Sequence, residues 1–244
     1  IELPFSYLIA SGDTTYIVPG RNIATVGTYR DINKWPKRDK RASASKKSIV
    51  NFSWLSPFTM QEVIKGKELL ERLRKEQGDN VASYNYNGCL IKNKSLQKGI
   101  KFYELAIRMF MGDVVSRHGS TLPESSIGTG CWTDLSGLLA PVEIVEELCD
   151  DLEKEYIDTI VEVEDRLQAM HKAYDEYCWN WTYKVILDYL GIDMLSATDV
   201  NRIMAEADAA RSEWLNAIRF DAEREFALGD VSEDEISNFL NNLE

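Results

Sequence analysis

The segment YIDTIVEVEDRLQAMHKAYDEYCWNW at residues 156–181 carries the clearest pattern in the sequence and decides the fold class. Apolar side chains recur in it at alternating steps of four and three residues, a seven-residue repeat held for about four heptads. They are Tyr156, Ile160, Val163, Leu167, Met170, Tyr174, Tyr177 and Trp181. This repeat is typical of long helices that pack on other helices. We therefore predict one helix over residues 156–190, ended by Gly191.

A second apolar run follows over residues 198–228 and includes Ile203 and Trp214. At 1.5 Å per residue, the two predicted helices would be roughly 50 and 45 Å long. Two helices of nearly equal length joined by a short turn form an antiparallel hairpin. We expect this long hairpin to end the fold, followed only by a short closing helix with an apolar stripe that includes Phe239.

The N-terminal part favours strands and then helices. Strand-like runs occur at Leu3–Ile9, Thr15–Val18, Asn22–Thr28 and Ile49–Leu55, and turn-forming residues separate the first three. Helical patterns follow, the first beginning at Ser56-Pro57 and the next near Ser95. The predicted fold class is therefore mainly α (α+β), with a small N-terminal β element followed by helices.

Charge divides the 244-residue chain unevenly. Residues 1–130 have a net charge of +8 and residues 131–244 a net charge of −20, which gives −12 for the whole chain. We predict a basic mixed β/α region at 1–140 and an acidic helical hairpin region at 141–244. The regions either serve different functions or attract each other across an internal interface. The negative total disfavours non-specific binding to nucleic acid or to anionic lipid, and no apolar run is long enough to span a membrane.

Four cysteines stand at positions 89, 131, 149 and 178. Their separations exclude a C-x-x-C pair, and no other metal-ligand spacing is present, so we predict no metal and no cofactor. Because no signal peptide is visible, we expect reduced thiols and a cytoplasmic protein. The chain opens in a strand-like run without an initiator Met, and we interpret it as a piece of a longer polypeptide. Cys178 lies among aromatic residues, which favours a packing role.

The stretch PGRNIATVGTYRDINKWPKRDKR at residues 19–41 is the best candidate for a ligand site. Between residues 21 and 47 there are nine basic residues and two acidic ones. Arg and Lys bind phosphate or carboxylate groups, and an aromatic plane stacks on a base or a sugar. We predict a basic loop that binds a nucleotide, a sugar phosphate or a phosphopantetheine, unless the loop docks on the acidic helices instead. The predicted ligand-binding residues are Arg30, Lys34, Trp35, Lys37 and Arg38.

Residues 117–121 read R-H-G-S-T and resemble the phospho-histidine motif of the histidine phosphatases. That chemistry needs the histidine at the end of a core strand and a second histidine in the same pocket. Here the motif follows a predicted helix, and the other histidine, His171, lies within the heptad repeat. We therefore expect a surface turn. Since no nucleophile–base pair is legible, the sequence does not decide whether the protein is an enzyme and identifies no catalytic residue.

Three segments together resemble the C-terminal part of an uncharacterised bacterial family: VPGRNIATVGTYRDINKWPKRDKR, NFSWLSPFTMQEVIKGKELL and YNYNGCLIKNKSLQKGIKFYELAI. Members of that family carry hexapeptide repeats, which form a left-handed β-helix, ahead of this part. The resemblance implies an accessory domain of a transferase-like protein, with a nucleotide-sugar or phosphate ligand bound by the basic loop.

The alternative hypothesis is a helical oligomerisation or docking module without a ligand site. In that hypothesis the heptad residues Tyr156, Ile160, Val163 and Leu167 drive self-association or docking on the β-helix domain.

Overall fold

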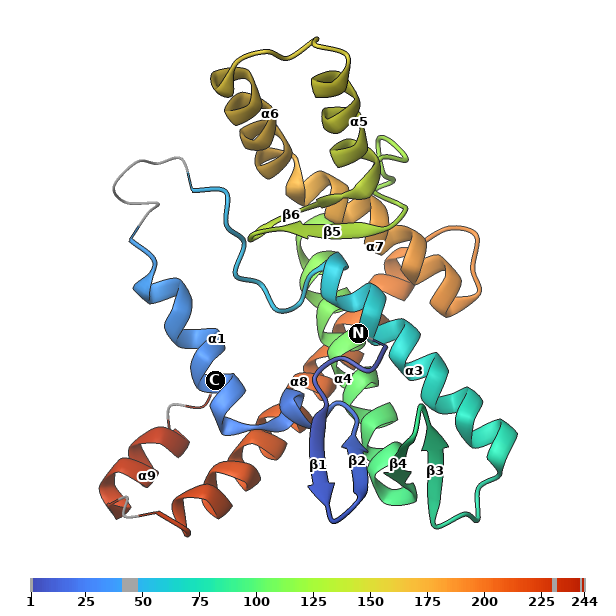
Figure 1. The fold of residues 1–244 in the computed structure, drawn as a ribbon, viewed down its shortest axis with the longest axis vertical. Helices are drawn as coiled ribbons and strands as arrows, with labels where there is room; N and C mark the ends of the chain where they lie inside the picture. The colour runs from blue at the N-terminus through green and yellow to red at the C-terminus, as the bar shows by residue number, and fades with distance from the viewer. Residues whose placement is uncertain (1, 41–47, 230–231, 242, 244) are drawn as a thin grey trace. The chain divides into compact units, whose positions relative to one another are not determined.

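The computed structural model describes residues 2–40, 48–229, 232–241 and 243, and the fold is mainly α with a small N-terminal sheet, as predicted (Figure 1). The elements in chain order are β1 (Tyr7–Ser11), β2 (Thr14–Val18), the 3-10 helix η1 (Arg21–Ala24), α1 (Val26–Arg38), α3 (Pro57–Gln77), β3 (Ser83–Tyr86), β4 (Cys89–Lys92), α4 (Asn93–His118), β5 (Trp132–Leu135), β6 (Leu138–Pro141), α5 (Val142–Glu153), α6 (Ile160–Lys172), α7 (Tyr174–Leu190), α8 (Ala197–Phe226) and α9 (Glu233–Asn241).

Two of the predicted strands form the N-terminal hairpin of a four-stranded sheet with the order β1-β2-β4-β3. Strands β1 and β2 pair antiparallel, and β2 joins β4 in parallel at Tyr16 and Leu90. Asn87 and Gly88, which connect β3 to β4, have φ values of 48° and 76°. Positive φ at both positions is the geometry that a two-residue hairpin turn requires and that Asn-Gly adopts easily.

The other two predicted strands were wrong. Residues 22–28 form η1 and the start of α1, because Thr25 is extended and its hydroxyl accepts a hydrogen bond from the Thr28 N–H, as a helix N-cap does. Residues 49–55 form no strand; the Asn51 side chain accepts the Ser53 N–H at 2.8 Å in a local turn. The hairpin β5–β6, on the other hand, was not among the predicted strands.

The predicted single helix over 156–190 is two helices. It begins four residues later, because Thr159 and Glu162 form a reciprocal capping box at the start of α6. The predicted helix is interrupted at Ala173 (φ −84°, ψ −1°), which is both the C-cap of α6 and the N-cap of α7. The two halves of the heptad stripe then bury different faces, since Met170 packs against the Leu138 cluster and Trp181 lies 5.8 Å from the ring of Phe110.

The predicted final hairpin falls on α7 and α8, which residues 191–196 join. The prediction of two nearly equal helices was wrong, because the break at Ala173 leaves α7 with 17 residues while α8 has 30. Gly191 ends α7 in the left-handed conformation (φ 63°), as the sequence predicted. Ser196 and Asp199 then exchange hydrogen bonds at the start of α8. No helix formed by the described residues is both long enough and apolar enough to cross a membrane.

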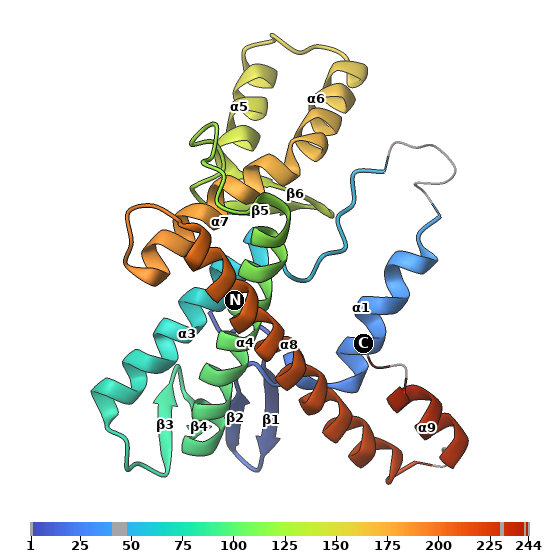
Figure 2. The same cartoon turned by 180° about the vertical axis from the view of Figure 1, so that it is seen from behind.

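The chain divides into two compact units that interleave along the sequence. Unit 1 contains residues 1–33, 62–109 and 206–244, and unit 2 contains residues 34–61 and 110–205. Unit 1 holds the four-stranded sheet and has a core that includes Leu70, Tyr84 and Tyr103. Unit 2 holds the β5–β6 hairpin and the α5–α6 pair, which Figures 1 and 2 both show side by side. The predicted boundary at residue 140 rests on charge and stays a prediction.

Candidate functional site

The five predicted ligand-binding residues lie on helix α1 and not in a loop, so that part of the prediction was wrong. A proline usually excludes its preceding residue from a helix, which is why Trp35-Pro36 suggested an irregular segment. Pro36 lies in the last turn of α1, and the helix ends two residues after it, at Arg38. The residues in question are Arg30, Lys34, Trp35, Lys37 and Arg38.

Arg30 is engaged within unit 1. Its guanidinium carbon lies 5.2 Å from the centroid of the Phe226 ring and 5.3 Å from that of the Phe239 ring. One guanidinium nitrogen is also 3.6 Å from the carboxylate of Glu225. These contacts pack α1 against the end of α8 and against α9, and they occupy the charge of Arg30.

The remaining four residues belong to a short segment, residues 34–40, that we call the basic stretch. Its only aromatic residue, Trp35, is 51% exposed. The Lys34 ammonium lies 5.0 Å from the Trp35 ring centroid, and the Arg38 guanidinium lies 5.9 Å from it. The basic stretch therefore presents an aromatic surface flanked by positive charge.

A better-enclosed set of cations lines a cavity in unit 1. The cavity has a volume of about 450 Å³, and η1, α4 and α8 contribute its walls. We call it the cationic cavity. Its lining residues are Arg21, Ala24, Lys98, Lys101, Phe102, Leu105, Glu213, Asn216, Ala217, Phe220, Asp221 and Arg224.

Two glycines allow the chain before Arg21 to approach helix α4 closely. A Cβ atom on Gly99 of α4 would lie 2.7 Å from the Pro19 Cβ, which is closer than side chains can pack. Gly20 has a φ of 64°, and a Cβ there would lie 3.2 Å from the ring of Tyr103. The left-handed turn at Gly20 then directs the chain into η1, so that Arg21 reaches the cavity beside Lys98 and Lys101.

Helix α8 is joined to η1 and to the start of α1 by one buried hydrogen bond and by one carboxylate. The indole N–H of Trp214 donates to the Ile23 carbonyl at 2.7 Å, and both side chains are buried. The Asp221 carboxylate accepts the Val26 N–H at 3.0 Å and forms an ion pair with Arg21. Because Asp221 holds both the start of α1 and the Arg21 guanidinium, it fixes the cation in the cavity wall.

The cavity lining has a positive excess, since four cations face two carboxylates. Arg21 pairs with Asp221, and Lys101 pairs with Glu213. Lys98 is exposed at the cavity, and the Arg224 guanidinium lies 5.8 Å from the ring of Phe220. Apolar lining comes from both phenylalanines and from Leu105. A site of this size and composition suits a small ligand that combines an anionic group with a planar or apolar part.

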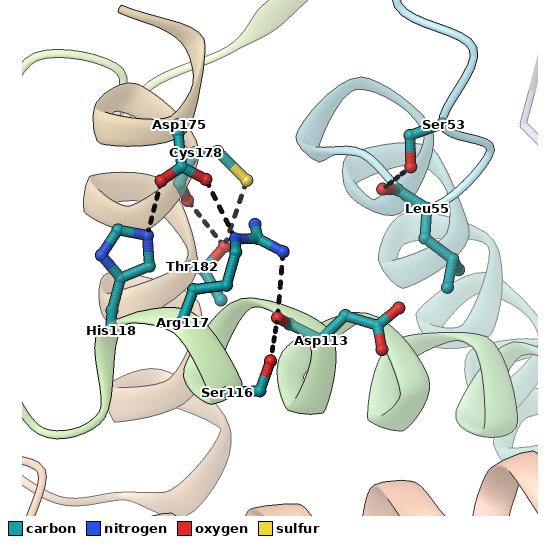
Figure 3. A network of polar contacts seen from close by, with 9 residues as sticks. All are labelled: Ser53, Leu55, Asp113, Ser116, Arg117, His118, Asp175, Cys178 and Thr182. Carbon is teal, nitrogen blue, oxygen red and sulfur yellow. Dashed lines mark hydrogen bonds and ion pairs between the residues drawn. The ribbon is translucent and has the colours of Figure 1, made fainter.

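The R-H-G-S-T motif lies at the C-terminal end of α4, within unit 2 (Figure 3). The Arg117 Nε lies 3.1 Å from one carboxylate oxygen of Asp175, and the His118 Nε2 lies 3.1 Å from the other. Gly119 follows with a φ of 61°, as expected for a residue that ends a helix. The expected surface turn is thus present, and Asp175 of α7 already lies against the Arg117 and His118 side chains that a phosphate would need.

The contacts of His118 also indicate a structural role for its side chain. Its imidazole stacks on the indole of Trp179, with the ring centroids 4.8 Å apart and the planes 5° from parallel. Its contact with Asp175 is at ion-pair distance without the angles of a hydrogen bond, and the His118 Nε2 atom is buried. Because Asp175 and Trp179 are one turn apart on α7, His118 joins the end of α4 to one face of that helix.

Beside this cluster, the Cys178 thiol is buried and makes no nucleophile. Burial raises the pKa of Cys178 to about 12, because the surrounding side chains exclude the water that would stabilise a thiolate. The thiol lies 4.0 Å from the Thr182 hydroxyl, which itself donates to the Cys178 carbonyl at 2.7 Å. The predicted packing role of Cys178 is therefore confirmed.

The four heptad residues of the assembly hypothesis have two different environments. Tyr156 and Ile160 are 74% and 80% exposed, whereas Val163 and Leu167 are partly buried. Leu167 packs against an internal cluster that includes Leu148. Val163 and Leu167 therefore stabilise unit 2 itself. Of the four residues, Tyr156 and Ile160 are the two that a partner could contact.

The comparisons with known proteins find two domains of unknown function. Residues 1–74 match the family model DUF4954, and residues 116–232 match the family model DUF6819. No curated protein and no solved structure matches the chain. The expected similarity to uncharacterised families is thereby confirmed, while the relationship to hexapeptide-repeat transferases stays a prediction.

The cationic cavity draws on both matched segments, since Arg21 lies in the first and Arg224 lies in the second. Sequence reasoning missed the cavity because Lys98 and Arg224 belong to two helices far apart in the sequence, and no local pattern shows that these helices line one cavity. The signal that was present is local: Gly20 before Arg21, and Gly99 one residue after Lys98, each mark a close backbone approach.

Proposed function

We propose that this chain is an accessory, ligand-binding domain of a transferase-like protein, and that unit 1 binds a phosphate-bearing ligand in the cationic cavity. The observation that carries the proposal is the convergence of Arg21, Lys98, Lys101 and Arg224 on one half-open cavity. Arg21 is held in place by the hydrogen bonds that it donates to the Ala24 carbonyl and to Asp221, so it contributes a fixed positive charge. Lys98 and Lys101 supply point charges, of which Lys101 also pairs with Glu213.

The apolar part of the lining narrows the ligand class to nucleotides and nucleotide sugars. Phe220 is 63% exposed, and Arg224 lies over its ring, so this pair offers a stacking surface for a base. Leu105 and Ala217 contribute apolar wall that a bare phosphate would not use. A β-helix domain that works on sugar nucleotides, as the family resemblance implies, would be a suitable cytoplasmic partner for such a domain.

The test is a thermal-shift screen against nucleoside diphosphates, nucleotide sugars, acyl-CoA, sugar phosphates and plain phosphate. A ligand at about 100 times its Kd adds about 2.7 kcal/mol to the stability. For a chain of this size that corresponds to a rise in Tm of about 5–10 °C. Lys98→Glu should abolish the rise, whereas Lys94→Glu, an exposed substitution on the same helix outside the cavity, should keep it.

A further variant separates the cationic cavity from the basic stretch. Arg38→Glu should leave the thermal shift unchanged, because Arg38 lines no part of the cavity. Loss of the shift in Arg38→Glu, with Lys98→Glu unaffected, would move the ligand site to α1. A flat response of the wild type to every compound would contradict ligand binding by this chain.

A second candidate function is assembly, because Tyr156 and Ile160 are exposed at the end of the α5–α6 pair. Apolar side chains that are 74% and 80% exposed in neighbouring positions favour a contact surface over a structural role. This function is compatible with ligand binding, since the exposed residues belong to unit 2 and the cationic cavity to unit 1.

A further inference from the structure

The end of the α5–α6 pair combines exposed apolar side chains with a high density of carboxylates. Leu152, Tyr156, Ile160 and Val161 are 41%, 74%, 80% and 60% exposed. Residues 143–165 contain eleven acidic residues and one lysine. We call the exposed end of this pair, residues 150–165, the acidic tip.

A shallow groove crosses the acidic tip and gives it a concave surface that a partner side chain could occupy. The groove has a volume of about 390 Å³ and is lined by Asp151, Tyr156, Ile157, Glu162, Asp165 and Arg166. Arg166 forms an ion pair with Asp151, so these two charges neutralise each other within the groove. The groove thus offers an aromatic ring together with the carboxylates of Glu162 and Asp165.

The basic stretch of the same chain has the complementary composition. Residues 34–40 read KWPKRDK and contain four basic residues and one acidic residue. Trp35 is 51% exposed, and the side chains of Lys37 and Arg38 are exposed as well. Both surfaces belong to unit 2, and each pairs an exposed aromatic side chain with a single sign of charge.

We propose that the acidic tip docks the basic stretch of a second copy of this chain. Trp35 of one copy would cover the apolar side chains of Tyr156 and Ile160 on the other, while Lys37 and Arg38 face the carboxylates of the tip. Aromatic and arginine residues at the centre of a contact contribute most of the binding energy, and the surrounding charges set the partner and the orientation. This inference rests on the assembly function proposed above and specifies its two surfaces.

Each contact joins two different patches, the basic stretch of one copy and the acidic tip of the other. Two copies that exchange basic stretches reciprocally form a closed, isologous dimer, whereas copies that do not exchange them reciprocally form a heterologous, longer assembly. The charge of −12 on each copy opposes association at long range. Local attraction dominates at about 0.1 M salt, where charges farther apart than about 10 Å are screened.

Sedimentation velocity of the full chain tests the proposal. The wild type should associate at about 0.1 M salt and dissociate at about 1 M salt, where the Debye length falls to about 3 Å. Two charge-reversal variants should each weaken association by about tenfold or more. The first is Lys37→Glu with Arg38→Glu in the basic stretch, and the second is Glu155→Lys with Asp165→Lys in the acidic tip. All four residues are exposed, so unchanged circular dichroism and melting should confirm that both variants fold.

The decisive step is to mix the two variants in equal amounts. Each retains one native surface that matches the other's, and the two reversed surfaces also match, so the mixture should regain the mass of the wild-type assembly. Asp188→Lys, an exposed reversal on α7, is the control and should not weaken association.

A wild type that stays monomeric at both salt concentrations overturns the assembly function together with this inference. An assembled wild type whose mass neither variant alters overturns only the inference, as does a mixture that remains monomeric.

Discussion

The substitution Gly99→Ala tests the packing that positions Arg21 at the cationic cavity. Alanine in the interior of a helix is ordinarily worth roughly 0.5–1 kcal/mol over glycine. At position 99, however, the new Cβ would lie 2.7 Å from the Pro19 Cβ, 3.0 Å from the Leu70 Cδ1 and 3.1 Å from the Pro19 carbonyl oxygen. Since one of the three contacts is with backbone and another with a rigid proline ring, the neighbours cannot yield without moving the turn before Arg21.

Overpacking of this kind costs about 1–3 kcal/mol, which exceeds the gain in helix propensity. We therefore expect Gly99→Ala to lower the free energy of unfolding by about 1–2 kcal/mol and Tm by about 2–8 °C. Urea denaturation monitored by circular dichroism measures the first quantity, and ligand binding should weaken in the same variant because Arg21 is displaced.

Gly27→Ala is the matched control for this prediction. Gly27 also lies in a helix, but a Cβ there would have no atom within 4 Å. It should therefore leave stability unchanged or raise it by about 0.5 kcal/mol. If Gly99→Ala proves as stable as the wild type or more stable, the close approach of the 19–20 turn to α4 is refuted.

Three further predictions concern single side chains. Asp221→Asn should destabilise the chain by about 1–3 kcal/mol in urea denaturation, since it removes the charge that the Arg21 guanidinium and the start of α1 share. At pH 8, iodoacetamide should label the exposed Cys149 and leave Cys178 unmodified in the native protein, as mass spectrometry would show; rapid labelling of Cys178 would contradict its burial. The Glu162 carboxylate accepts hydrogen bonds from the hydroxyl and the backbone N–H of Thr159, which hold the pKa of this carboxyl below its ordinary value of 4.5. Its stabilising effect is therefore full above pH 4.5 and is lost as the pH falls through the lowered pKa. NMR titration should show the pKa of Glu162 return toward 4.5 in a Thr159→Ala variant.

Helices with one continuous apolar face were predictable from the sequence. Pro57 located the start of α3, and Gly191 correctly marked the end of α7. The break at Ala173 was not predictable, because the heptad pattern continues through it. Only the presence of different clusters on each side, with Leu138 on one and Phe110 on the other, requires the chain to turn there.

The candidate site was less predictable than the fold. Helix α1 has many charged residues and a proline, so its helical state depends on packing against α8 and α9, whose aromatic residues Phe226 and Phe239 lie about 190–210 positions further along the chain. For the same reason the sequence showed that the segment is basic, but it did not show that Arg30 packs against Phe226 and Phe239. The cationic cavity combines Arg21 with residues of two distant helices, and no local pattern specifies such a convergence.

The central claim, that unit 1 binds a phosphate-bearing ligand in the cationic cavity, is tested most directly by ³¹P NMR of a nucleoside diphosphate titrated with the protein. The phosphate resonances should broaden and shift with the wild type and with Lys94→Glu, and they should stay sharp and unshifted with Lys98→Glu. Resonances that stay unchanged with the wild type, or that change equally with Lys98→Glu, would contradict the claim.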